Sequence, residues 1–217
     1  MKIENFYGNK LLFCTKEEFD NLTIEQMEGV DTAFCYAKLQ RYKIEFLYKN
    51  NDLSMANLCV NAIFSYLKHN FCGVGDNVKD SVGYFGVHYI NSNKMIQLSA
   101  TNFLTKPFVI EKTEHNTLYK LGEVGNQHWV CEKGNTHNIP KDKSVNVHEY
   151  YDVVEKEGYV ECTVDFFERG VGKTQACGSG AFCVGMHLFK IHGKEVVVKT
   201  ENGDKYFVNQ NTISVEI

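Results

Sequence analysis

The spacing of hydrophobic residues predicts several strands. Two segments, 44–48 and 160–166, place an apolar residue at every second position, which is the period of a strand with one buried face. The middle of the chain is therefore expected to be mainly β-structure. Shorter strands are predicted at 85–89, 95–98, 108–111, 195–199 and 213–215.

Helical spacing follows three candidate helix starts. The segment Thr15–Glu18 reads as a capping box and predicts a helix that continues to Met27. Apolar residues also recur at helical spacing directly after Cys59, and again over 181–189. Cys59 and Cys177 are thus each predicted to precede a helix.

A unit of strand, loop, cysteine and helix occurs twice, near residues 44–69 and 160–191. Two pseudo-equivalent lobes would explain this repeat, and no linker or low-complexity segment marks their boundary, which we place near residue 103. The expected division is 1–103 with Cys59, 104–208 with Cys177, and a final strand within 209–217 that could return to the first lobe.

Composition and charge narrow the class of protein. Of 217 residues, 43% are hydrophobic and 13% aromatic, which is enough apolar surface for a packed core. The net charge is −4 with both signs interspersed, so no broad basic face is available for nucleic acid. No apolar run is long enough to cross a bilayer, and the first residues lack the hydrophobic core of a secretion signal. We therefore expect a cytoplasmic protein that binds neither nucleic acid nor membrane.

The eight cysteines include no C-x-x-C pair, so the sequence contains no local zinc knuckle or redox dithiol motif. In a reducing compartment they should all be thiols. Six of them are expected to be small buried hydrophobic residues: Cys14, Cys35, Cys72, Cys131, Cys162 and Cys183.

The segment from Glu168 to Ala181 carries the strongest chemical signal. Its Gly172-Lys173-Thr174 is similar to the end of a phosphate-binding P-loop, but that motif requires a glycine where Phe167 stands. The other interpretation is a cysteine followed by Gly-Ser-Gly, whose free backbone N–H groups begin a helix. Such a helix start attracts anions and lowers the pKa of a thiol.

Four blocks of the chain resemble the diaminopimelate epimerase family. The segment 168–181 matches the family pattern E-R-G-x-G-x-T-x-A-C-G-S-G-A, which contains the second active-site cysteine, at nearly every position. The pattern around the first cysteine, N-A-D-G-S-x-x-x-x-C-G-N-G, aligns without a gap with 50–62, where two glycines are replaced by Val60 and Ala62. The two shorter blocks are Gly125-Asn126-Gln127-His128, similar to G-N-P-H, and Gly8-Asn9, similar to the amino-terminal G-N.

The chain also departs from the family in three places. The segment R-x-x-G-I-G-A-D-G is absent, and Phe64 stands where an arginine follows the first cysteine. The chain is also shorter than usual for the family.

The resemblance implies an α+β fold of two lobes, each a β-sheet wrapped around a central helix, with the active site in the cleft between them and a homodimeric assembly. It also implies an amino-acid racemase or epimerase that needs no metal and no pyridoxal cofactor. Because an amino acid's α-hydrogen is a very weak acid, its removal requires a base in contact with it and stabilisation of the developing enediolate. One base would return the proton to the same face. Cys59 and Cys177 would therefore act from opposite faces, one as thiolate and the other as thiol.

The same resemblance assigns roles to further residues. Glu168 and His128 would hold the α-ammonium group. Asn9, Asn61, Asn126 and Arg169 would contact other polar parts of the substrate. The helix starts after the cysteines would face the carboxylate, with Val60 after Cys59, and with Gly178 and Ser179 supplying N–H groups after Cys177.

The sequence supports more than one hypothesis about the substrate. The segment 59–66 looks similar to C-G-N-A-x-x-S-Y of the related histidine racemases, whereas the retained Glu168-Arg169-Gly170 fits a diaminopimelate epimerase better. Histidine is the preferred hypothesis, with diaminopimelate or a lanthionine-type substrate second. Two hypotheses from other functional classes remain: an amino-acid-binding relative without catalysis, and a redox sensor in which Cys59 and Cys177 form a disulfide.

Overall fold

The computed structural model describes most of the chain. The described residues are 1–40, 43–70, 77–79, 84–90, 94–100, 106–122, 125–136, 139 and 145–216.

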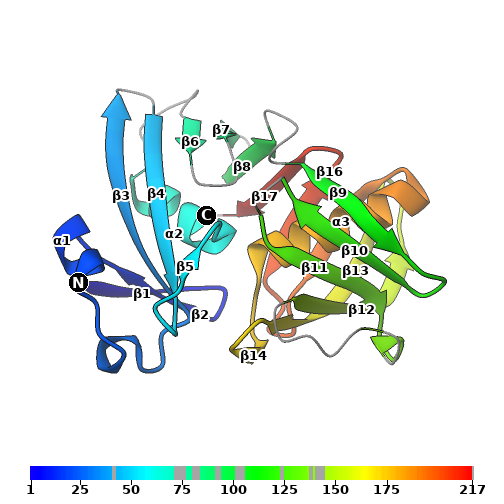
Figure 1. Ribbon diagram of the computed structural model, residues 1–217. Helices are drawn as coiled ribbons and strands as arrows, with labels where there is room; N and C mark the ends of the chain where they lie inside the picture. Colours follow the sequence, from blue (N-terminus) through cyan, green and yellow to red (C-terminus); the bar gives the residue numbers. More distant parts are fainter. Residues whose placement is uncertain are drawn as a thin grey trace.

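The protein has a two-lobed α+β fold with many strands and few helices (Figure 1). The first half contains β1 (Lys2–Phe6), β2 (Asn9–Phe13), α1 (Lys16–Asp20), the 3₁₀ helix η1 (Glu25–Met27), β3 (Thr32–Gln40), β4 (Lys43–Asn50), β5 (Met55–Ala56), α2 (Val60–Asn70), β6 (Asn77–Lys79), β7 (Tyr84–Ile90) and β8 (Met95–Ala100). The second half contains β9 (Pro107–Lys112), β10 (Asn116–Leu121), β11 (Gln127–Glu132), β12 (Asn146–Glu155), β13 (Tyr159–Glu168), β14 (Gly172–Thr174), α3 (Gly178–His192), β15 (Glu195–Lys199), β16 (Lys205–Asn209) and β17 (Thr212–Glu216).

Backbone pairing runs continuously from one half to the other. Within the first half, β2 lies parallel to β3, and β3 pairs antiparallel with β4. Within the second half, β13 pairs antiparallel with β12 and parallel with β15. The last strand, β17, pairs with β16 on one side and with β8 on the other, so it joins the two halves, as Figure 1 shows. The boundary expected near residue 103 falls outside the described residues.

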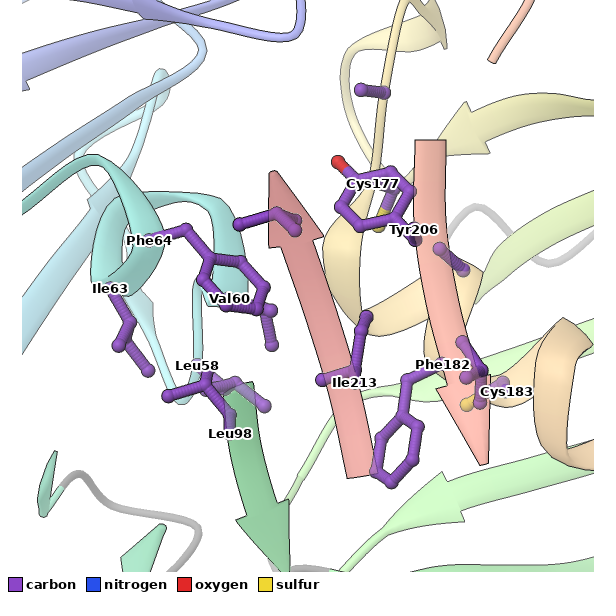
Figure 2. Packing of buried hydrophobic residues seen from close by; sticks show 14 of the residues in the cluster. Leu58, Val60, Ile63, Phe64, Leu98, Cys177, Phe182, Cys183, Tyr206 and Ile213 are labelled. Atoms are coloured by element: carbon purple, nitrogen blue, oxygen red, sulfur yellow. The ribbon is translucent and has the colours of Figure 1, made fainter. Parts of the chain in front are cut away.

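Each half surrounds one buried helix, as the sequence predicts. Every residue of α2 from Val60 to Leu67 is buried, and α3 is buried from Gly178 to Met186. The apolar side chains of both helices belong to one hydrophobic cluster that also includes residues of β8, β16 and β17. Figure 2 shows Phe64 of α2 and Phe182 of α3 on opposite sides of this core. Gly193 ends α3 with a φ of 68°, a left-handed conformation that glycine adopts easily.

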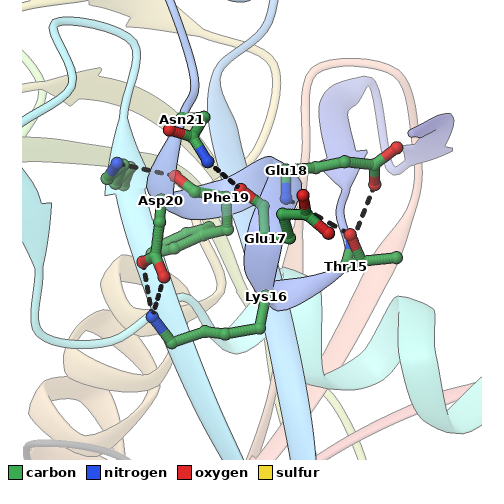
Figure 3. A network of polar contacts seen from close by, with 8 residues as sticks. Thr15, Lys16, Glu17, Glu18, Phe19, Asp20 and Asn21 are labelled. Carbon is green, nitrogen blue, oxygen red and sulfur yellow. Dashed lines mark hydrogen bonds and ion pairs between the residues drawn. The ribbon is translucent and has the colours of Figure 1, made fainter.

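The predicted first helix is shorter than the sequence indicates. The capping box is present, since the Thr15 hydroxyl accepts from the Glu18 N–H and the Glu18 carboxylate accepts from the Thr15 N–H (Figure 3). The helix nevertheless ends at Asp20, where the Asn21 side chain donates to a carbonyl of the last turn. The expectation of one helix continuing to Met27 is therefore wrong, although Met27 is buried in the small cluster that covers this end of the sheet. No helix in the described ranges is both long and apolar enough to span a membrane.

Candidate active site

Both candidate cysteines lie immediately before a buried helix. Cys177 is the N-cap of α3: its backbone is extended, and its sulfur accepts a hydrogen bond from the Gly180 N–H at 3.4 Å. Cys59 stands directly before α2, and its carbonyl accepts from the Ile63 N–H at 3.2 Å. Both helix starts predicted from the sequence are thus confirmed.

The starts of α2 and α3 touch each other. A Cβ added to Gly178 would lie 2.6 Å from Oδ1 of Asn61 and 2.8 Å from Cγ1 of Val60. These separations are too short for any side chain, so the close approach of the two helix starts requires glycine at 178. The two cysteines that precede these helices are thereby brought to one place.

A cavity of about 40 Å³ lies at this junction and contains both cysteines in its wall. Its volume is enough for a few water molecules. It brings together nine of the eleven residues predicted for the site: Asn9, Cys59, Val60, Asn61, Asn126, Glu168, Cys177, Gly178 and Ser179.

The tenth predicted residue, Arg169, lines a second cavity of about 30 Å³. This cavity adjoins the first, because Glu168, Asn126 and Asp31 line both. The Arg169 side chain is exposed, and its backbone N–H donates to Asn146 at 2.8 Å. Arg169 therefore lies at the outer end of the site.

The eleventh, His128, is fully buried and is not among the described residues that line either cavity. Its Nδ1 lies 2.9 Å from Nε2 of His148 and 3.4 Å from Nδ2 of Asn146. Because the Asn146 oxygen accepts from a backbone N–H, its amide nitrogen must donate to His128. His128 Nδ1 is then an acceptor, and His148 donates to it. Burial lowers the pKa of His128 to about 3 and that of His148 well below its usual value, so both rings are neutral.

The His148 ring packs against the first turn of α3. A Cβ on Gly180 would lie 2.5 Å from the His148 ring. One nitrogen of each histidine and the sulfur of Cys177 lie within 4.8 Å of one another, a grouping compatible with a metal ion. Metal-bound histidines normally donate their second ring N–H to a partner, whereas Nε2 of His128 and Nδ1 of His148 have none among the described residues. This arrangement fits packing better than metal binding.

Three polar residues that line the cavity were missed by the sequence analysis, Asp31, Thr32 and Asn50, as were the apolar Ala56 and Leu58. Asp31 lies just before β3, and its carboxylate accepts from the Lys10 N–H at 2.8 Å across the parallel pairing of β2 and β3. No sequence motif indicates this contact. For Asn50 a signal was available, because it is the first residue of the N-A-D-G-S block around the first cysteine.

Comparison with known proteins identifies the fold. No protein-family model matches the chain, and no curated protein sequence matches it. Solved structures do. A phenazine biosynthesis protein of the PhzF family from Bacillus anthracis matches with a TM-score of 0.65 and 11% identity over 98% of this chain and 92% of that one. A predicted epimerase from Pseudomonas aeruginosa matches with a TM-score of 0.60 and 9% identity over 97% and 92% of the two chains.

A third structure, a hydroxyproline epimerase from Agrobacterium vitis with bound trans-4-hydroxy-L-proline, matches with a TM-score of 0.56 and 13% identity over 86% of this chain and 73% of that one. The chain has the diaminopimelate epimerase-like fold. The expected fold class is thereby confirmed, since these matches cover both lobes of the diaminopimelate epimerase-like architecture.

The electrostatics of the site differ from the expectation for a helix start. Burial raises the pKa of Glu168 to about 7, and the Asp31 carboxylate raises it further, against hydrogen bonds from Thr174 and Cys177. Burial also raises the pKa of Cys59 to about 12 and that of Cys177 well above its usual value. The negative charge of Glu168 contributes to both thiol shifts.

The helix starts therefore do not by themselves produce thiolates. The N–H of Ala62 stabilises the Cys59 thiolate, as the N–H of Gly180 does for Cys177, but burial outweighs both. A positive charge entering the cavity would favour ionisation of a thiol and of Glu168 together. The described cysteines are all free, including Cys59 and Cys177, and Cys72 lies outside the described residues.

Proposed function

We propose that this protein is a cofactor-independent amino-acid racemase or epimerase in which Cys59 and Cys177 exchange the α-proton of the substrate. The observation that supports this most is that both cysteines, each at the start of a buried helix, line one small cavity with Glu168. The fold is shared with a hydroxyproline epimerase, which supports the reaction class.

In this mechanism the ammonium group of the substrate lies against Glu168 and supplies the positive charge that the cavity needs. One sulfur, as thiolate, takes the α-proton and becomes a thiol. The electron pair of the broken C–H bond moves into the carboxylate to give an enediolate, which N–H groups of Gly178 and Ser179 stabilise. The opposite thiol then gives its proton to the other face and becomes a thiolate, so the two sulfurs have exchanged states.

Histidine is the first substrate we propose, because 59–66 resembles the corresponding segment of histidine racemases. A diaminopimelate or lanthionine-type substrate is the second, and Arg169 favours it, since a guanidinium at the outer end of the site could pair with a distal carboxylate.

The test is a screen for α-proton exchange. L-Amino acids, meso-diaminopimelate, lanthionine and trans-4-hydroxy-L-proline are each incubated with the protein in heavy water, and deuterium at the α-carbon is measured by mass spectrometry. We expect labelling of histidine with conversion to the D-enantiomer, and loss of both in Cys59→Ser and Cys177→Ser. Cys35→Ala, at a buried cysteine outside the cavity, is the matched control and should retain activity.

Two results would reject the proposal. Full activity in either serine variant would exclude the two-thiol mechanism. Binding of an amino acid without any exchange would favour a binding protein.

A further inference from the structure

Tyr206 is a buried tyrosine of β16 whose hydroxyl reaches into the other half of the molecule. Its side chain is 0% exposed, and its hydroxyl donates a 2.7 Å hydrogen bond to Oδ1 of Asn61 in the first turn of α2. The phenol also interacts electrostatically with Cys177 and Cys59. Figure 2 shows the Tyr206 ring beside Cys177. No motif in the sequence singles out this residue.

A chain of hydrogen bonds continues from Tyr206 to Asp31. The amide nitrogen of Asn61 donates to Oδ1 of Asn9, and the amide nitrogen of Asn9 lies 3.5 Å from Oδ2 of Asp31. A carboxylate only accepts hydrogen bonds, so Asn9 must turn its NH₂ group to Asp31 and its oxygen to Asn61. Asn61 must then turn its NH₂ group to Asn9 and its oxygen to Tyr206. The Asp31 charge sets the direction of the bonds at one end of the chain, and the Tyr206 hydroxyl holds the Asn61 oxygen at the other end.

We propose that Tyr206 is a positioning residue that makes this wall of the cavity a donor of hydrogen bonds to the substrate carboxylate. This inference rests on the proposed function. Asn9 and Asn61 both line the cavity, and the chain uses the oxygen of each amide as an acceptor. Each NH₂ group uses one hydrogen in the chain and keeps one for a ligand. The two side chains therefore present N–H donors to the cavity. These donors can bind a carboxylate, and they bind the more negative oxygens of an enediolate more strongly.

Tyr206→Phe removes only the hydroxyl and leaves the Asn61 oxygen without its partner. The amide is then held only through its NH₂ group, by Asn9, and it can rotate and present its oxygen to the substrate, where it would repel the carboxylate. A buried acceptor without a partner is unfavourable, so rotation towards a donor elsewhere is expected. The loss should be larger in the transition state than in the ground state, because the charge on the carboxylate oxygens grows there.

The experiment compares Tyr206→Phe with Tyr7→Phe. Tyr7 also carries a hydroxyl across the junction of the two halves. Its ring packs edge-on against Tyr206, but its hydroxyl donates to the Lys205 carbonyl at 3.2 Å and is not part of the amide chain. For the amino acid identified in the exchange screen, Tyr206→Phe should lower kcat by about 10- to 100-fold, with a smaller change in KM. This is less than the roughly 100- to 1000-fold effect of losing a direct donor to the developing charge, because Tyr206 acts through Asn61. Tyr7→Phe should stay within about twofold of the wild type, because an exposed hydrogen bond contributes little.

Two further measurements separate positioning from a merely structural role. The first is the ratio of the dissociation constant of the amino acid to that of its carboxamide, which should rise at least about tenfold in Tyr206→Phe only, because the turned oxygen repels a carboxylate but accepts from an amide. The second is a double-mutant cycle with Asn61→Ala, in which Tyr206→Phe should have no further effect on kcat. An unchanged ratio, or a full additional loss in the Asn61→Ala background, would overturn the inference and leave the two-thiol mechanism intact.

If no amino acid undergoes exchange, the proposed function fails and the hydrogen-bond chain is judged by the side-chain amide NMR signals of Asn61. Two separate signals, protected from solvent exchange in the wild type and lost in Tyr206→Phe, support the chain. Signals that are the same in both proteins overturn it.

Discussion

Replacing Glu168 by glutamine should stabilise the fold above pH 7 while removing the group proposed to hold the substrate ammonium. The change is conservative in shape, and the Gln oxygen can keep the 2.8 Å hydrogen bond from the Thr174 hydroxyl. What disappears is a carboxylate whose pKa burial raises from its ordinary 4.5 to about 7. Each pH unit between these values corresponds to about 1.36 kcal/mol, so keeping the charge costs the folded state at most about 3 kcal/mol.

The direction of this pH dependence follows from the pH at which the folded and the unfolded chain each bind the proton. Below about pH 4.5 the carboxyl group is protonated in both the folded and the unfolded chain, and its titration contributes no difference. Between pH 4.5 and about 7 the unfolded chain loses the proton first, so the free energy of unfolding falls as the pH rises. Above pH 7 the full cost is present. Because the side chain is partly exposed, we expect a gain of about 1–3 kcal/mol for the variant at pH 8.

The assay is urea unfolding of both proteins at pH 5 and pH 8, followed by the fluorescence of Trp129, the only tryptophan. The variant should exceed the wild type mainly at pH 8, with equal denaturant slopes. A variant that is less stable than the wild type at pH 8, or a difference that does not depend on pH, would refute the placement of an ionised, partly buried Glu168 in the wall of the cavity.

Three further outcomes are expected. The kcat/KM of the wild type should decrease as the pH drops below an apparent pKa of about 7, because Glu168 takes up a proton and can no longer pair with the ammonium group. In Glu168→Gln this decrease should be absent, which is checked by measuring kcat/KM of both proteins across the pH range. Thr15→Ala removes the acceptor of the α1 capping box and should lower the free energy of unfolding by about 1 kcal/mol in urea titrations; no change would mean that α1 does not depend on its cap. Gly180→Ala would place a methyl group 2.5 Å from the His148 ring and should cost about 1–3 kcal/mol in the same titrations, whereas unchanged stability would contradict the position of His148.

The parts of the site that the sequence could predict are those carried by local pattern. Helical spacing after Cys59 and before Gly193 locates α2 and α3. The position of each cysteine directly before a helix follows from that spacing. The same local information misjudged α1, because buried Met27 continues the apolar spacing while the Asn21 side chain has already ended the helix.

The parts that could not be predicted depend on contacts between distant segments. Asp31 reaches the cavity because β2 and β3 lie parallel, and Tyr206 reaches Asn61 across 145 positions of the chain. The histidine predicted for the site, His128, is stacked on His148 behind the cavity wall. Strand alternation specifies that a residue faces the core, but not whether it lines a cavity or lies behind it.

The most direct test of the two-thiol mechanism is the isotopic content of both enantiomers during the first turnovers in heavy water. Starting from the L-enantiomer, the account predicts deuterium in the D-product from the beginning and none in the remaining L-substrate, with the mirror result from the D-enantiomer, because separate thiols serve the two faces. Early deuterium in the remaining substrate, at the level found in the product, would mean that a single base serves both faces and would contradict the account.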